Sequence, residues 1–129
     1  MNELTEPVIV LDLGLPPRKL HPNGRVAWRE KATLTKAYRG YAADTTVLAM
    51  QKLSMKRPLL TKARIQFIFY VARRQDPDNL LAWMKSGIDG MADAGLLADD
   101  RDVAYEPVVQ ALDPKHPRVI CQVRVPGSF

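Results

Sequence analysis

Apolar and polar residues alternate most regularly along residues 61–71. One face of this stretch carries Ala63, Ile65, Phe67, Phe69 and Val71. A period of two predicts a strand with one buried face, which we expect at the centre of a sheet. A shorter strand is expected at residues 8–13. Two more are expected at residues 103–112 and 118–125, paired with each other in antiparallel fashion.

Helical spacing replaces the alternation in two other stretches. Along residues 29–53 a helix-spaced set recurs, comprising Tyr38, Tyr41, Ala42, Thr45, Leu48 and Ala49. This spacing predicts a long amphipathic helix. A second helix is expected over residues 77–94, because Asp76 suits an N-cap, Pro77 suits the first helical position and Gly95 suits the end.

The resulting order of elements, β-α-β-α-β-β, predicts an α+β fold in which two main helices pack on a mixed β-sheet. The chain has the length of one domain, so we expect residues 1–129 to form a single small domain. A composition of 47% hydrophobic and 26% charged residues is that of a folded globular protein. Ordinary core packing must therefore supply the stability.

A helical projection of residues 77–94 separates a core face from a polar edge. Asp78, Lys85 and Asp89 form a stripe along that polar edge. Trp83 points nearly opposite to the core face, so we expect it to lie on the outward side of the helix. A continuous helix would thus present two carboxylates and an ammonium group in a row.

The net charge of +5 and the sequence pI near 9.6 favour a polyanionic partner such as nucleic acid. Positions 18–39 are strongly basic, with Glu30 as the only acid. Positions 76–102 reverse the sign, with seven aspartates against Lys85 and Arg101. An acidic island in a basic protein indicates a bound cation, and a divalent metal would be that cation.

Carboxylates of the acidic island are expected to converge from three elements. Asp76 follows the central strand, Asp78 opens the second helix, and Asp99–Asp100 lie in the loop before the next strand. Their hard oxygen atoms are the donors that Mg²⁺ requires, and Mn²⁺ accepts the same donors. Such a metal would activate water and neutralise charge on a phosphate, while Lys85 would stabilise charge that develops there.

Each of these residues also has a purely structural interpretation. Asp76 alone is more often a helix cap than a ligand, and Asp99–Asp100 are common turn residues. Lys85 and Asp89 stand four positions apart and would form an ordinary surface ion pair. Capping explains one acid at the start of the helix but not two separate clusters, which favours the metal site.

Cys121 is the only cysteine and lies among apolar residues of an expected strand, so we expect a packing role for it. No intrachain disulfide can form, which favours a reducing compartment. The sequence has no signal-peptide pattern and no apolar run of membrane-spanning length. A soluble, cytoplasmic protein without a membrane partner is therefore expected.

Two sequence blocks resemble the RusA family of Holliday-junction resolvases, which is common in bacteriophages and prophages. The first is an Arg-Arg-x-Asp-x-Asp-Asn pattern at residues 73–79, followed by Lys85-x-x-x-Asp89 and the Asp99–Asp100 pair. The second is a Pro-Pro-x-x-Leu-x-Pro-Asn-x-Arg pattern at residues 16–25, followed by Trp28-Arg29. Together the blocks extend over most of residues 8–103.

The resemblance implies a metal-dependent DNA endonuclease in a bacterial or phage-infected cell. It implies a set of metal ligands, Asp76, Asp78 and Asp100, with Asp99 or Asp89 in support. It also implies catalytic roles for Asp76, Asp78, Asp100 and Lys85. The interval between Asn79 and Lys85 is longer than in the family, which moves Lys85 farther along its helix.

Phosphate contacts follow from the same resemblance and from the basic charge of the first block. They are expected for six cations, Arg18, Lys19, Arg25, Arg29, Arg73 and Arg74. His21 lies in the same segment and is expected to be a loop residue without a chemical role. These contacts should carry little sequence information, because they address the DNA backbone.

The leading hypothesis is a Mg²⁺- or Mn²⁺-dependent endodeoxyribonuclease that resolves Holliday junctions in DNA recombination and repair. Paired nicks in four-way DNA need two symmetry-related sites, which fits a homodimer. Two alternatives stay open, namely a nuclease for other branched or single-stranded DNA and a non-catalytic DNA-binding protein. A nucleotide hydrolase is disfavoured because the chain has no Gly-rich phosphate loop.

Overall fold

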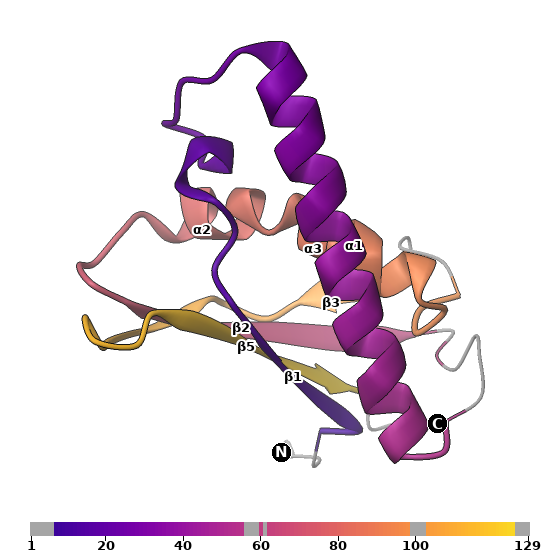
Figure 1. The fold of residues 1–129 in the computed structure, drawn as a ribbon. Helices are drawn as coiled ribbons and strands as arrows, with labels where there is room; N and C mark the ends of the chain where they lie inside the picture. The colour runs from indigo at the N-terminus through magenta and orange to yellow at the C-terminus, as the bar shows by residue number, and fades with distance from the viewer. Residues whose placement is uncertain (1–6, 56–59, 61, 99–102, 126–129) are drawn as a thin grey trace.

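The computed structural model describes residues 7–55, 60, 62–98 and 103–125. Within these residues, five strands form one mixed sheet and three α-helices lie on one side of it (Figure 1). The expected small α+β domain is thereby confirmed. None of the helices in these ranges has the length and apolar character that crossing a membrane requires.

The sheet is built around β2 (Ala63–Val71), the strand expected at its centre. On one side β2 pairs antiparallel with β5 (Arg118–Arg124), which pairs in turn with β1 (Ile9–Leu13). On its other side β2 pairs in parallel with β3 (Val103–Tyr105) and farther along with β4 (Val109–Leu112). The predicted alternation of β2 is confirmed, because its apolar face is buried throughout.

The expected antiparallel pairing of residues 103–112 with residues 118–125 is wrong. The first of these stretches forms two short strands on either side of Pro107, and both pair with β2. β5 instead lies between β1 and β2, where the side chains of Val119, Cys121 and Val123 are almost inaccessible to solvent.

Cys121 has the packing role that its apolar surroundings predict. Its thiol is buried in the core, and its Sγ atom lies 4.0 Å from Sδ of Met91. Burial raises the pKa of the Cys121 thiol, because the charged form would lose its hydration. The side chain is therefore a small neutral core residue.

The long helix α1 (Trp28–Lys52) has nearly the expected bounds, but its buried stripe differs from the expected one. The buried residues recur every four positions, at Tyr38, Ala42, Thr46 and Met50. Leu48, which was expected on the buried face, is 59% exposed. The face of α1 that packs against α3 is the one that is buried. Apolar residues also lie on the neighbouring faces, so the sequence alone did not reveal which face would be buried.

Two tyrosines of α1 hold the end of β1. The Tyr38 hydroxyl donates to the Gly14 carbonyl oxygen at 2.7 Å, and the Gly14 N–H donates to the Tyr41 hydroxyl at 2.8 Å. Burial raises the pKa of Tyr38, with smaller contributions from Tyr41 and Cys121, so the phenol stays protonated. This clamp fixes the point at which the chain leaves the sheet toward α1.

The expected second helix starts and ends as predicted but is broken in the middle. Asp76 is its N-cap, Pro77 its first residue, and Gly95 adopts a positive φ of 88° after its end. The break falls at Met84, between α2 (Pro77–Trp83) and α3 (Lys85–Asp93). Glycines of α3 allow a close approach to α1: a Cβ at Gly90 would lie 2.3 Å from the Arg39 carbonyl oxygen. Contact with α1 therefore holds α3, while α2 is held elsewhere.

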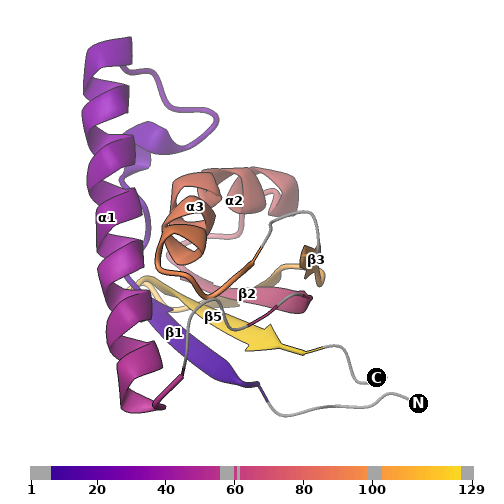
Figure 2. The same cartoon turned by 90° about the vertical axis from the view of Figure 1, so that its right-hand side faces the viewer.

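The N-terminal half of α1 extends beyond the rest of the domain (Figures 1 and 2). No residue between Trp28 and Ala37 is buried. The C-terminal half, by contrast, packs along α3 and β1. The segment that leads from β1 to Trp28 runs beside α2 and forms one wall of the candidate site.

Candidate nucleic-acid interface and metal site

A cleft of about 600 Å³ lies between the segment before α1 and the end of β2. Arg18 lines it from the short 3₁₀ helix η1 (Arg18–Leu20), and Arg73 lines it from the bend after β2. The other polar lining residues are His21, Asn23 and Gln75. Two cations from distant parts of the chain thus face one cavity, which suits a phosphate group.

A hydrogen-bond network joins the two walls of the cleft. His21 Nδ1 accepts from the Asn23 N–H at 3.1 Å, which assigns the ring proton to Nε2. His21 Nε2 then donates to Gln75 Oε1 at 3.0 Å. Gln75 also exchanges two bonds with the Gln110 side chain: its N–H donates to Oε1 at 2.9 Å, and its carbonyl oxygen accepts from Nε2 at 2.8 Å. The network fixes the segment between β2 and α2.

Trp83 is a second anchor beneath the same segment. Its indole Nε1–H donates to the Pro17 carbonyl oxygen at 2.9 Å, and its ring meets the His21 ring edge-on with centroids 5.3 Å apart. Trp83 is 5% exposed, so the expected outward orientation is wrong. Residues before α1 cover this side of α2, which a projection of the helix alone does not reveal.

Asp76 and Asp78 stand at the start of α2, directly beyond the cleft residue Gln75. Asp76 Oδ1 accepts from the Asp78 N–H at 2.8 Å, as an N-cap does. This bond engages one oxygen of Asp76, and a carboxylate offers a second. Both residues are exposed at the N-terminal end of the helix. The capping interpretation and a ligand role for Asp76 are therefore compatible.

Lys85 and Asp89 lie on α3 and interact with each other and with α1. Lys85 Nζ is 3.8 Å from Asp89 Oδ2, and Arg39 Nη1 is 4.0 Å from the same oxygen. The break at Met84 separates this pair from Asp76 and Asp78, so the expected continuous stripe does not form. Lys85 has a side chain that is 82% exposed, which leaves it room to move.

The remaining expected ligands, Asp99 and Asp100, lie outside the described residues. In the ranges that the structure does describe, no group of three or more His, Cys, Asp or Glu residues could hold a metal ion. Mg²⁺ sites often use one or two carboxylates, with water and substrate phosphate as the other ligands. The oxygen donors of Asp76 and Asp78 suit such a site chemically.

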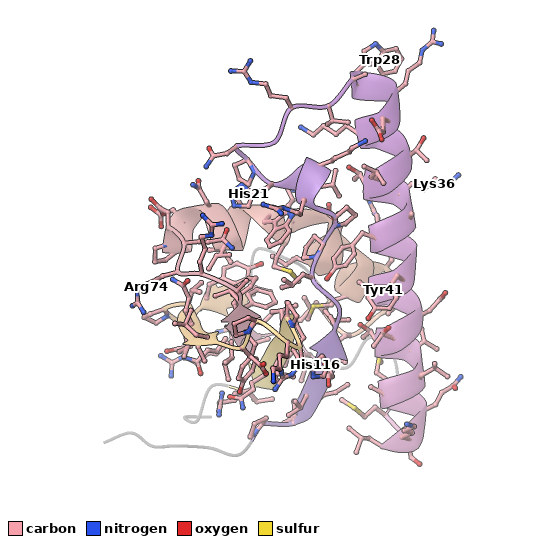
Figure 3. All side chains as sticks on the ribbon, turned by 60° about the vertical axis from the view of Figure 1, so that its left-hand side comes forward. His21, Trp28, Lys36, Tyr41, Arg74 and His116 are labelled. Carbon is pink, nitrogen blue, oxygen red and sulfur yellow. The ribbon has the colours of Figure 1, made fainter. Side chains whose placement is uncertain are left out.

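The other four expected DNA-binding cations do not line the cleft. Lys19 forms an exposed ion pair with Glu30, with Nζ 2.6 Å from Oε2. Arg29 places its guanidinium 5.5 Å from the centroid of the Trp28 ring. Arg25 and Arg74 are exposed. Figure 3 shows Arg74 at the edge away from α1, with His21 between it and the end of α1 that carries Trp28.

No family model matches the sequence. The chain is similar to an uncharacterized protein from Xylella fastidiosa (strain Temecula1 / ATCC 700964), with 35% identity over 104 residues. The match covers 78% of this chain and 65% of that protein. The chain therefore corresponds to less than two thirds of this relative.

Sequence reasoning missed the neutral polar residues of the cleft. His21 was expected to have no chemical role, and Gln75 and Gln110 were given none, although all three belong to the network between its walls. One signal was present, because Gln75 stands between Arg73-Arg74 and Asp76, inside the block that carries the chemistry. Nothing local in the sequence links Gln75 to Gln110.

Proposed function

We propose that the chain is a metal-dependent endodeoxyribonuclease of the RusA type that resolves Holliday junctions by paired phosphodiester hydrolysis as a homodimer. The observation that carries the proposal is the joining of two sequence blocks at one cleft. Arg18 and Arg73 line this cleft. Gln75 lines it as well, and Asp76 directly follows Gln75 in the sequence. Phosphate-binding cations beside carboxylates with free oxygens are what phosphodiester hydrolysis requires.

The residues of the cleft divide the work between binding and chemistry. Arg18 and Arg73 hold backbone phosphates, and the network through His21 and Gln75 keeps the two walls in register. Asp76 and Asp78 would hold Mg²⁺ or Mn²⁺, with Asp99 and Asp100 added by the family resemblance. When bound, such an ion supplies a lower pKa for a coordinated water and neutralises charge on the phosphate.

Lys85, another proposed catalytic residue, lies on a different helix from Asp78. It pairs with Asp89 on α3, beyond the break at Met84. Its exposed side chain would have to leave this pair to reach a phosphate at the start of α2. Surface ion pairs of this kind contribute little to stability, so breaking the pair with Asp89 costs little free energy.

The test compares cleavage of a synthetic four-way junction, a forked DNA and a linear duplex, with Mg²⁺, Mn²⁺ or EDTA. Asp78→Asn should reduce junction cleavage at least about 100-fold, because it removes a charged ligand. Asp76→Asn should do the same, and it is the sharper variant, because asparagine caps a helix as well as aspartate. Loss of cleavage with unchanged thermal stability then reports on the chemistry. Asp44→Asn, at an exposed position of α1, is the matched control and should cut like the wild type.

Other outcomes separate the competing functions. Asp78→Asn cleavage at the wild-type rate would show that the metal-site assignment is wrong. Junction binding without cleavage under either metal would favour the non-catalytic DNA-binding protein, in which Asp76 only caps α2. Cleavage of forks in preference to four-way junctions would favour a nuclease for other branched DNA.

A further inference from the structure

The free end of α1 carries an exposed aromatic side chain that has no place in the cleft described above. Trp28 is 74% exposed, and the helix around it contributes no buried residue up to Ala37. Figure 3 shows Trp28 at the tip of the helix and Lys36 farther down, pointing away from the sheet. The ring is therefore accessible to a partner molecule.

The surface beside Trp28 is cationic. One face of α1 forms a shallow groove lined by Trp28, Lys31, Ala32, Thr35, Lys36 and Arg39. These positions recur at helical spacing, so the tryptophan and the cations share a face. Glu30, the only acid between positions 18 and 39, is engaged by Lys19. The charge of this face therefore complements a polyanion.

The composition of the groove also distinguishes between partners. A stable protein interface needs about 800 Å² on each partner, with an apolar centre, and a membrane-surface helix needs several large apolar side chains. Ala32 is the only aliphatic neighbour of Trp28 in the groove. One aromatic ring flanked by lysines is instead the arrangement that binds unpaired nucleotides, in which a base stacks and phosphates meet cations.

We propose that Trp28 is a stacking platform for an unpaired base of branched DNA, with Lys31 and Lys36 binding the adjoining phosphates. Arg29, whose guanidinium lies 5.5 Å from the ring centroid, adds a second planar group at the platform. The inference rests on the proposed function, because it names the part of a branched substrate that α1 contacts. It concerns binding alone, so it can be tested without cleavage.

The test measures binding in EDTA to an oligothymidylate, a forked DNA and a linear duplex. Trp28→Ala should weaken binding to the oligothymidylate and the fork about tenfold or more and leave duplex binding unchanged. Trp28→Phe should retain most of the affinity, because it keeps a ring. Replacing Lys31 and Lys36 together by glutamine should lower the dependence of binding on salt. The matched control is Lys52→Gln, at the far end of the same helix.

Intrinsic fluorescence gives a direct readout of stacking. In a Trp83→Phe variant Trp28 is the only tryptophan, and oligothymidylate should quench its emission. The proposal would be overturned if Trp28→Ala bound each of the three DNAs as tightly as the wild type does. An equal loss on fork and duplex would also overturn it, as would a change of oligomeric state in Trp28→Ala, which would indicate that a second copy covers the ring. If stacking is observed but the wild type cuts no DNA with Mg²⁺ or Mn²⁺, the nuclease assignment fails and the platform stands.

Discussion

The two halves of α1 differ in what surrounds them, although they form one continuous helix. Toward the C-terminus, Tyr38, Ala42, Thr46 and Met50 are buried in a single stripe. Toward the N-terminus, from Trp28 to Ala37, nothing is buried. The first half is thus free to present side chains, while the second half holds the helix to the domain. A long helix can in this way carry a binding surface away from the core that stabilises it.

The two tryptophans show the same contrast in a single residue type. Trp83 is 5% exposed and hydrogen-bonded to Pro17, whereas Trp28 is 74% exposed. Both lie on helices beside the segment of residues 15–25, which covers one ring and leaves the other uncovered. Substitution of the first should therefore affect stability, and substitution of the second should affect binding.

The largest effect that separates the two regions is expected from Trp83→Ala. Loss of a buried tryptophan side chain should lower the free energy of unfolding by about 4 kcal/mol. Trp28→Ala should change it by no more than about 0.5 kcal/mol, because the side chain packs against little. Urea denaturation followed by circular dichroism measures both. Comparable losses of stability in the two variants would mean that the free end of α1 is packed in solution. The two tryptophans would then not differ in the way described.

Local sequence signals were enough to predict much of the fold. The alternation in β2 was readable because one face of that strand is buried along its whole length. Asp76, Pro77 and Gly95 marked the ends of the α2–α3 segment, because capping depends on a few neighbouring residues. The bounds of α1 followed from its helical spacing in the same way.

Contacts between distant segments account for the predictions that were wrong. Trp83 is buried because Pro17 and His21 cover it, and no periodicity in α2 records that cover. The break at Met84 reflects two separate anchors, Trp83 beneath the N-terminal segment and Gly90 against α1. A helical projection assumes one straight helix and one buried face, and both assumptions failed here.

In the candidate site too, local features were predictable from sequence, whereas contacts between distant segments were not. The cap formed by Asp76 was predictable, because it involves residues two positions apart. Phosphate contacts were expected for both Arg18 and Arg73 through the family resemblance, but their place in one cleft depends on how the N-terminal segment packs against the end of β2. Asp89 was assigned to the same stripe as Asp78, but the turn at Met84 directs it to Arg39.

A second pair of variants tests how the packed half of α1 is held. In Gly90→Ala the new Cβ would lie 2.3 Å from the Arg39 carbonyl oxygen, so α3 must move away from α1. We expect a loss of about 3 kcal/mol in the free energy of unfolding. Gly40→Ala is the matched control on the exposed side of α1, where a Cβ meets nothing within 4 Å.

That control should raise the free energy of unfolding by about 0.5–1 kcal/mol, because alanine stabilises an exposed helix position relative to glycine. Thermal or urea unfolding of the two variants gives the difference directly. Stability changes of opposite sign in the two variants would show that the close crossing at Gly90, and not the helix propensity of the segment, fixes α3 on α1. A neutral Gly90→Ala would contradict the close approach.

The smallest effect is expected at the boundary between the two halves, where Arg39 meets Asp93. Arg39 donates from Nε to one carboxylate oxygen of Asp93 and from Nη2 to the other, the latter at 2.8 Å. The hydrogen bond from Arg39 lowers the pKa of Asp93 below its ordinary value. A depressed pKa in the folded state means that the pair stabilises above the unfolded pKa, near about 3.9. That stabilisation is lost as the pH falls through the folded pKa.

Asp93→Asn should therefore be slightly less stable than the wild type at pH 7, and the difference should disappear well below pH 4. The effect is small because both side chains are exposed and screened by solvent. Urea midpoints at the two pH values measure it. In an Arg39→Gln background the same substitution should show no such pH dependence, since the hydrogen bond that lowers the pKa is gone. A stability difference of equal size at both pH values would mean that Asp93 stabilises the fold through packing and not through its charge.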